Sequence, residues 1–109
     1  MYRGTTPDYI LSIPGYDITE ATIFVTIKQG SGRILTLTND ALIVSGDSQG
    51  TSIAFSLTQK QTLNFKAGTA NVQARFIFSD NEAYATDTKS ITIRPILYER
   101  EIHYAGNND

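Results

Sequence analysis

The sequence contains no cysteine, no tryptophan and a single histidine. Without cysteine, the chain has no disulfide framework, no thiolate metal ligand and no thiol nucleophile. With one histidine, a zinc site would need carboxylates for its other ligands, a set that zinc rarely uses. These absences exclude several kinds of stabilising and catalytic site, so the fold must depend on its hydrophobic core.

Charge is also scarce and nearly balanced. Nine Lys and Arg residues stand against 11 Asp and Glu residues, which gives a net charge of -2. Because no basic excess is present to neutralise phosphates, we expect no nucleic-acid partner. No apolar run approaches the roughly 20 residues of a membrane span, and the first residues lack the apolar stretch of a secretory signal. We therefore expect a protein that is made and folded in the cytoplasm and does not bind a membrane.

The sequence has instead a regular alternation of apolar and polar residues. Its 109 residues suit a single domain. Ile23, Val25 and Ile27 would face one side of a strand, and Thr22 and Thr26 the other. Turn-forming residues separate the segments of this kind, which are residues 9–13, 21–29, 33–38, 41–45, 51–57, 71–78 and 89–94. This pattern predicts an all-β fold, an immunoglobulin-like antiparallel β-sandwich of about seven strands.

One segment departs from the alternation. Residues 57–65 have a polar middle between Leu57, Leu63 and Phe65. Thr58 is a good N-cap residue, so we expect a single helical turn that runs to about Leu63. In a sandwich this turn would lie at the crossover between the sheets, where Leu63 and Phe65 would close one end of the core.

The segment after Pro95 is unusually apolar for a chain terminus. Pro95 cannot donate a ladder hydrogen bond, so it ends the last strand or lies on an edge. The apolar residues beyond it are Ile96, Leu97, Tyr98, Ile102 and Tyr104. Two interpretations stay open: either the last strand continues past a bulge, or the segment is an arm that docks on a neighbouring subunit.

We expect residues 1–98 to form the sandwich domain and residues 99–109 to form a C-terminal arm or tail, in which residues 105–109 are disordered. Tyrosine combines a large contact area with a polar tip, which suits protein interfaces. The residues predicted to form an interface are Tyr2, Tyr98, Ile102 and Tyr104.

Candidates for chemistry are few. His103 lies near the end of the chain with no nucleophile motif, which favours a surface or interface histidine over an acid–base catalyst. Two pairs of acids could serve glycoside hydrolysis or bind calcium. They are Asp17 with Glu20 and Asp80 with Glu82, and both fall in predicted turns without calcium-loop spacing. We therefore predict no catalytic residues, no metal, no cofactor and no enzymatic activity.

Four short blocks of sequence stand out by their order and spacing. They are residues 3–7 (RGTTP) followed by 13–14 (IP), residues 23–30 (IFVTIKQG), residues 56–65 (SLTQKQTLNF) and residues 72–75 (VQAR). Together they cover nearly the whole chain, and they resemble a family of small prophage-encoded proteins of Gram-positive bacteria.

The resemblance implies a phage structural protein, such as a tail, baseplate or head accessory component, and a place in the virion. Its partners would be other phage structural proteins and further copies of itself. The resemblance implies no active site. A carbohydrate- or receptor-binding module that uses loop tyrosines and acids is the alternative function, and a small hydrolase would need the acid pairs to work together.

Overall fold

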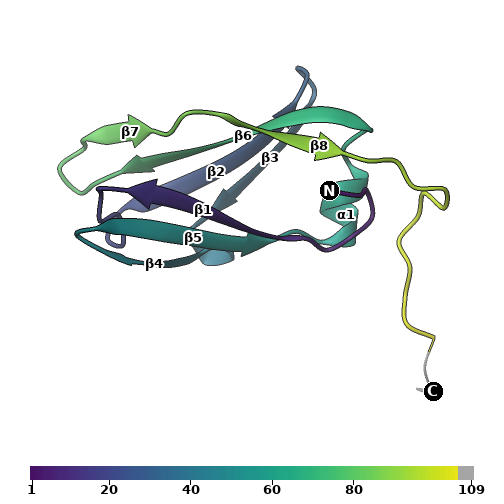
Figure 1. Cartoon of the computed structure of the whole chain (residues 1–109), viewed down its shortest axis with the longest axis horizontal. Coiled ribbons are helices and arrows are strands. Elements are labelled where there is room, and N and C mark those ends of the chain that lie inside the picture. Colours follow the sequence, from purple (N-terminus) through teal and green to yellow (C-terminus); the bar gives the residue numbers. More distant parts are fainter. Residues whose placement is uncertain (106–109) are drawn as a thin grey trace.

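The computed structural model describes residues 1–105 and contains two antiparallel sheets that face each other (Figure 1). The first sheet has the order β1 (Asp8–Pro14), β5 (Gly50–Ser56) and β4 (Ile43–Asp47). The second sheet has the order β3 (Arg33–Thr38), β2 (Thr22–Gln29) and β6 (Gly68–Ile77). Its far edge is shared by β7 (Ala83–Ala85) and β8 (Lys89–Ile93), which pair with different halves of β6.

This strand order confirms the predicted immunoglobulin-like sandwich. In such a fold, strands B, E and D form one sheet, and C′, C, F and G form the other. Here β1, β5 and β4 occupy the first set, and β3, β2, β6 and the pair β7 and β8 occupy the second. The place of the first strand, A, beside β1 is empty in residues 1–105, and Tyr2 instead pairs in parallel with Arg94, at the end of β8.

The alternation in the sequence decides which residues form the core. In β2, the side chains of Ile23, Val25 and Ile27 are fully buried, whereas Phe24 on the opposite face is 38% exposed. In β6, Val72 and the alternate residues after it are buried in the same way. Because successive side chains of a strand point to opposite faces, the inner faces of both sheets supply one continuous core.

Two local features differ from the pattern predicted from the sequence. The short strand β7 was not predicted, because its three residues are too few to show a period. The turn-forming residues between segments 41–45 and 51–57 mostly extend the two strands, because Asp47 pairs with Gly50, which leaves a turn of two residues. The carboxylate of Asp47 accepts a hydrogen bond of 2.8 Å from the amide of Gln49, so these polar residues shape the hairpin.

The predicted helical turn is present as α1 (Gln59–Leu63). The hydroxyl of Thr58 accepts a hydrogen bond from the amide of Gln61, and the side chain of Gln61 accepts one from the amide of Thr58. This reciprocal capping box supplies partners for two backbone groups at the start of a short helix. Phe65 follows the helix and is 1% exposed, whereas Leu63 is half-buried.

A short 3-10 helix, η1 (Asn39–Ala41), connects β3 to β4. The side-chain oxygen of Asn39 accepts a 2.7 Å hydrogen bond from the amide of Ile23, and its side-chain nitrogen donates to the carbonyl of Ala21 at 3.1 Å. Asn39 therefore fixes the crossover between the sheets to the start of β2.

Burial of the Tyr9 ring, which packs 5.6 Å from that of Phe55, raises the pKa of Tyr9 above its usual value. Because the folded-state pKa lies above the unfolded one, the neutral Tyr9 hydroxyl favours the folded state. This contribution to the free energy of unfolding is present below the unfolded pKa, near pH 10, and is lost as pH rises through the folded pKa. Between about pH 8 and about pH 11, we expect the free energy of unfolding to fall less for Tyr9→Phe than for the unchanged protein. Urea unfolding at both pH values measures this, and an equal loss would contradict it.

Candidate functional site

Arg3, in the RGTTP block, joins three parts of the chain. Its Nε donates a 2.6 Å hydrogen bond to the carbonyl of Phe65, and one terminal nitrogen donates at 3.0 Å to the carbonyl of Leu63. The other terminal nitrogen forms an ion pair with Glu99. The Arg3 side chain is only 16% exposed. Arg3 therefore caps the end of α1 and holds the segment that follows β8.

The neighbours of Arg3 also make structural contacts. Gly4 has a φ of +73°, and a β-carbon there would lie 2.9 Å from Cδ1 of Ile96. The hydroxyl of Thr62, which is fully buried, donates a 2.9 Å hydrogen bond to the carbonyl of Thr5. A left-handed backbone and a close side chain both favour glycine at position 4. The RGTTP block thus fastens the N-terminal segment to α1.

The segment after β8 leaves the sandwich, and we call residues 95–105 the arm. In Figure 1 it runs away from both sheets, and it contains no helix or strand. The interpretation of a bulged strand continuation is therefore wrong. The edge beside Arg94 is already occupied, because its amide donates to the carbonyl of Met1 at 2.7 Å and its carbonyl accepts from the amide of Arg3 at 3.0 Å.

A second anchor holds the arm further along. The side-chain nitrogen of Gln59 donates to the carbonyl of Ile102 at 2.8 Å, and the side-chain oxygen accepts from the amide of Ile102 at 2.7 Å. Apolar side chains of the arm remain exposed, namely Leu97, Tyr98, Ile102 and Tyr104. Three of the four predicted interface residues thus lie together on the arm. The fourth, Tyr2, lies on the edge of the sandwich.

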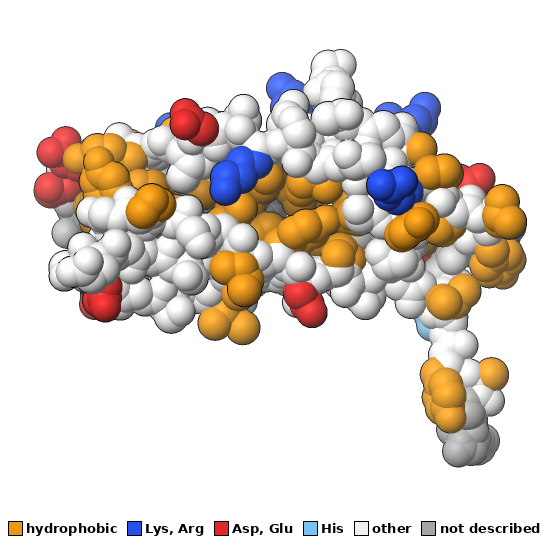
Figure 2. All heavy atoms as spheres, in the orientation of Figure 1, with side chains coloured by type: hydrophobic (Ala, Val, Ile, Leu, Met, Phe, Trp, Pro, Cys, Tyr) orange, Lys and Arg blue, Asp and Glu red, His pale blue; other side chains and the backbone are white. Residues whose placement is uncertain are grey.

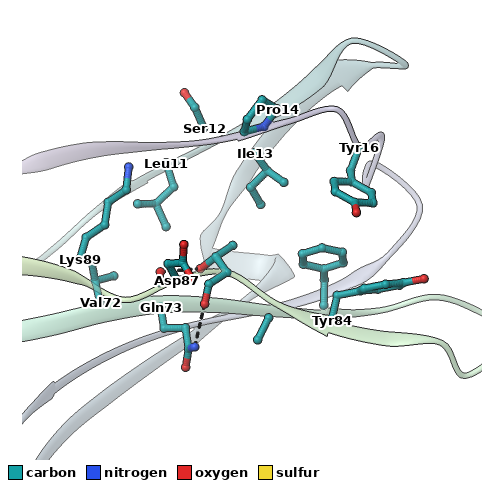
Figure 3. A pocket seen from close by; sticks show the side chains of 13 residues that line it. Leu11, Ser12, Ile13, Pro14, Tyr16, Val72, Gln73, Tyr84, Asp87 and Lys89 are labelled. Atoms are coloured by element: carbon teal, nitrogen blue, oxygen red, sulfur yellow. Dashed lines mark hydrogen bonds between the residues drawn. The ribbon is translucent and has the colours of Figure 1, made fainter.

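A groove of about 440 Å³ lies between β1 and the β7–β8 edge. Leu11 and Ile13 of β1 point into it toward Val72, while Ser12 points away (Figure 3). Figure 2 shows hydrophobic side chains along the floor of this hollow. The groove exists because strand A, which covers this edge in other immunoglobulin-like sandwiches, is almost missing here. We call it the edge groove.

The backbone of β1 is unpaired on the groove side. The amide of Leu57 donates to the carbonyl of Pro7, and that of Gly15 to the carbonyl of Gln49, so odd-numbered residues of β1 bond to β5. Because bonding direction alternates along an antiparallel strand, the backbone groups of even-numbered residues such as Ser12 point to the groove. No strand in residues 1–105 pairs with them.

The polar groups of the groove are mostly engaged with each other. The side chain of Gln73 donates to the carbonyl of Thr86 at 2.8 Å, and the hydroxyl of Thr86 accepts from the amide of Ala74 at 3.1 Å. With the described residues, Asp87 and Lys89 form no side-chain hydrogen bond or ion pair, so they carry the charges available to a ligand.

Aromatic rings close one end of the groove. The rings of Tyr16 and Tyr84 lie 6.0 Å apart, and Phe76 stacks on Tyr84 at 5.6 Å (Figure 3). Sequence reasoning missed both tyrosines, because they come from loop and short-strand positions far apart in the chain. The site is therefore mainly apolar and aromatic, with one charge of each sign.

The acidic pairs predicted from the sequence do not meet at this site. The carboxylate of Asp17 accepts from the amide and hydroxyl of Thr19, and these bonds lower the pKa of Asp17. The carboxylate of Asp80 accepts from the amide of Glu82 at 3.0 Å. Both acids therefore shape turns, and neither lines the edge groove. Within residues 1–105, no three His, Asp or Glu residues are grouped to hold a metal ion.

No helix in the part of the chain that the structure describes is long and apolar enough to cross a membrane. The chain matches no protein-family model, and no curated protein or solved structure shows significant similarity to it. The features that indicate a function are therefore the edge groove, the arm and the four sequence blocks.

Proposed function

We propose that the protein is a structural module of a phage or prophage particle, made in the host cytoplasm and incorporated into the virion. It would serve as a tail, baseplate or head accessory component and act through protein–protein assembly. Its partners are further copies of itself and other phage structural proteins, and it is not an enzyme. The observation that carries this proposal is the arm, an anchored segment whose apolar side chains face solvent.

The energetics of the arm support docking on a protein surface. Tyr104 is 93% exposed, and Leu97 has no neighbours that shield it. Burying a large apolar side chain stabilises a complex by about 1.5–3 kcal/mol at most. The contacts of Gln59 and Arg3 already restrict the arm, which reduces the entropy lost on docking. Contiguous exposed apolar surface of this kind typically marks an interaction site.

Removing the arm tests the proposal. We expect the full chain to sediment as assemblies at micromolar concentration, and a chain that ends at Pro95 to sediment as a folded monomer. Analytical ultracentrifugation measures the state, and circular dichroism with urea unfolding verifies the fold. Within residues 1–105, no residue of the buried core lies beyond Ile93, so the shortened chain should keep its sheets.

A substitution in the full chain provides a matched control for the truncation. Ile102→Asp places a charge on the apolar surface of the arm and should reduce assembly. Arg100→Gln keeps every apolar residue of the arm and should leave a larger share of the protein assembled. Equal sedimentation of the full and shortened chains would contradict assembly through the arm. Unfolding of the shortened chain would show instead that the arm belongs to the core.

The alternative function, a carbohydrate- or receptor-binding module, is favoured by one observation. Tyr16 and Tyr84 expose ring surface at the end of the edge groove, with Asp87 also lining the groove. Aromatic walls with a few polar groups are typical of small-molecule sites. If the protein is strictly monomeric and binds glycans, and if Tyr84→Ala abolishes that binding, this function is favoured over assembly.

A further inference from the structure

We propose that the edge groove receives the arm of a second copy of this chain as an added strand. The inference rests on the proposed function, because it names the partner surface of the arm. Addition of a strand to an exposed sheet edge is a recurrent mode of peptide recognition, in which the backbone supplies affinity and alternate side chains supply specificity.

The groove has the features that such a strand requires. Its floor contains inward-pointing apolar side chains of both sheets, including Leu11 and Val72. Its β1 edge presents, at Ser12, backbone groups that pair with no strand of residues 1–105. The β8 edge already accepts an added segment, because the amino group of Met1 donates a 2.8 Å hydrogen bond to the carbonyl of Thr92. The rest of this edge, from Met1 toward β7, pairs with no strand in the part of the chain that the structure describes.

The arm has the matching pattern. In a strand, residues 98–104 would place Tyr98, Arg100, Ile102 and Tyr104 on one face, and Glu99, Glu101 and His103 on the other. The first face is apolar except for one cation, whereas the second is polar. At roughly 3.3 Å per residue these residues span about 20 Å, as does β1, which has the same number of residues and borders the groove.

The charges also match. Arg100 is the only charged residue on the apolar face of the arm, and Asp87 lines the groove that this face would enter. Opposite charges on neighbouring strands favour one pairing over its alternatives.

A second copy, and not the same molecule, is the source of the strand. The arm of a chain starts at Pro95, beside Arg94, where residues 1–3 occupy the edge of β8. To enter its own groove the arm would have to reverse direction and pass over those residues. Figure 1 shows it running away from β1 and β7. Donor and acceptor surfaces then differ, so reciprocal exchange of arms would close a dimer, and one-way transfer would give a head-to-tail assembly.

Disulfide cross-linking tests this geometry, because the chain has no cysteine of its own. Chains with Ser12→Cys are mixed with chains that carry Glu99→Cys, Glu101→Cys or His103→Cys, which together cover three registers. Residues paired across strands have β-carbons roughly 4.5–5.5 Å apart, close enough for a disulfide after a small adjustment. We expect one of the mixtures to form the disulfide heterodimer at least tenfold faster than the control.

The control chain carries Ser45→Cys, an exposed serine on β4 at the opposite edge of the same sheet. Adding Ile102→Asp to the donor chain should abolish the preferred cross-link. If truncation of the arm dissolves the assembly but no donor prefers Ser12→Cys, the arm docks elsewhere, and only this inference fails. Cross-linking of Ser12→Cys chains with each other alone, or a monomeric full chain, would also overturn it.

Discussion

Phe65→Ala is expected to lower the free energy of unfolding by about 3–5 kcal/mol, which is the usual cost of removing a buried aromatic ring. Phe65 is 1% exposed and ranks among the largest fully buried side chains of the protein. It lies after α1 and closes that end of the core, so the cavity left by the ring could not be filled without moving the helix. Urea unfolding monitored by circular dichroism gives the change.

Phe24→Ala is the matched control, because it makes the same substitution on the outer face of β2, where the ring is 38% exposed. We expect its cost to be well below that of Phe65→Ala, since less apolar surface returns to water. Equal losses for the two variants would contradict the assignment of Phe65 to the core and, with it, the position of α1.

Arg3→Ala is expected to lower the free energy of unfolding by about 2–3 kcal/mol, in the range found for hydrogen bonds to a charged group. The substitution leaves the carbonyls of Leu63 and Phe65 without their donors at the end of α1. The ion pair with Glu99 adds little, because that carboxylate is largely exposed. Loss of the ion pair should still release the part of the arm around Glu99. Limited proteolysis with trypsin would detect this as faster cleavage after Arg100.

Arg3→Lys separates charge from geometry. Lysine keeps the charge but lacks the planar fork that reaches two carbonyls, so it should restore only part of the lost stability. Arg75→Ala on the exposed face of β6 is the control and should change stability by less than about 0.5 kcal/mol. If both alanine variants cost the same, Arg3 does not hold α1 as the structure indicates.

The sheets could be predicted because their determinants are local. The alternation in β2 identifies Ile23 and Val25 as core residues and Phe24 as an outward residue before any contact is known. Thr58 and Gln61 lie three positions apart, so the capping box is also readable from sequence. In both cases the physical cause operates within one strand or one helical turn.

The edge groove and the role of Arg3 could not be predicted, because they arise from contacts between distant segments. Arg3 and Phe65 are 62 positions apart, and no local pattern indicates that a guanidinium caps α1. The groove depends on which strand is missing beside β1 and β8, which is a property of the topology. The two interpretations of the residues after Pro95 stayed open because the hydrogen bonds of Met1 with β8 were unknown.

Those hydrogen bonds have a practical consequence for protein engineering. The first three residues run parallel to the end of β8, with Tyr2 beside Arg94. Any residues fused ahead of Met1 would be directed back along the same edge, past Ser90 and Lys89. A purification tag at that end would thus compete for the surface that lies open next to β7, and its removal would be a precondition for measuring how copies associate.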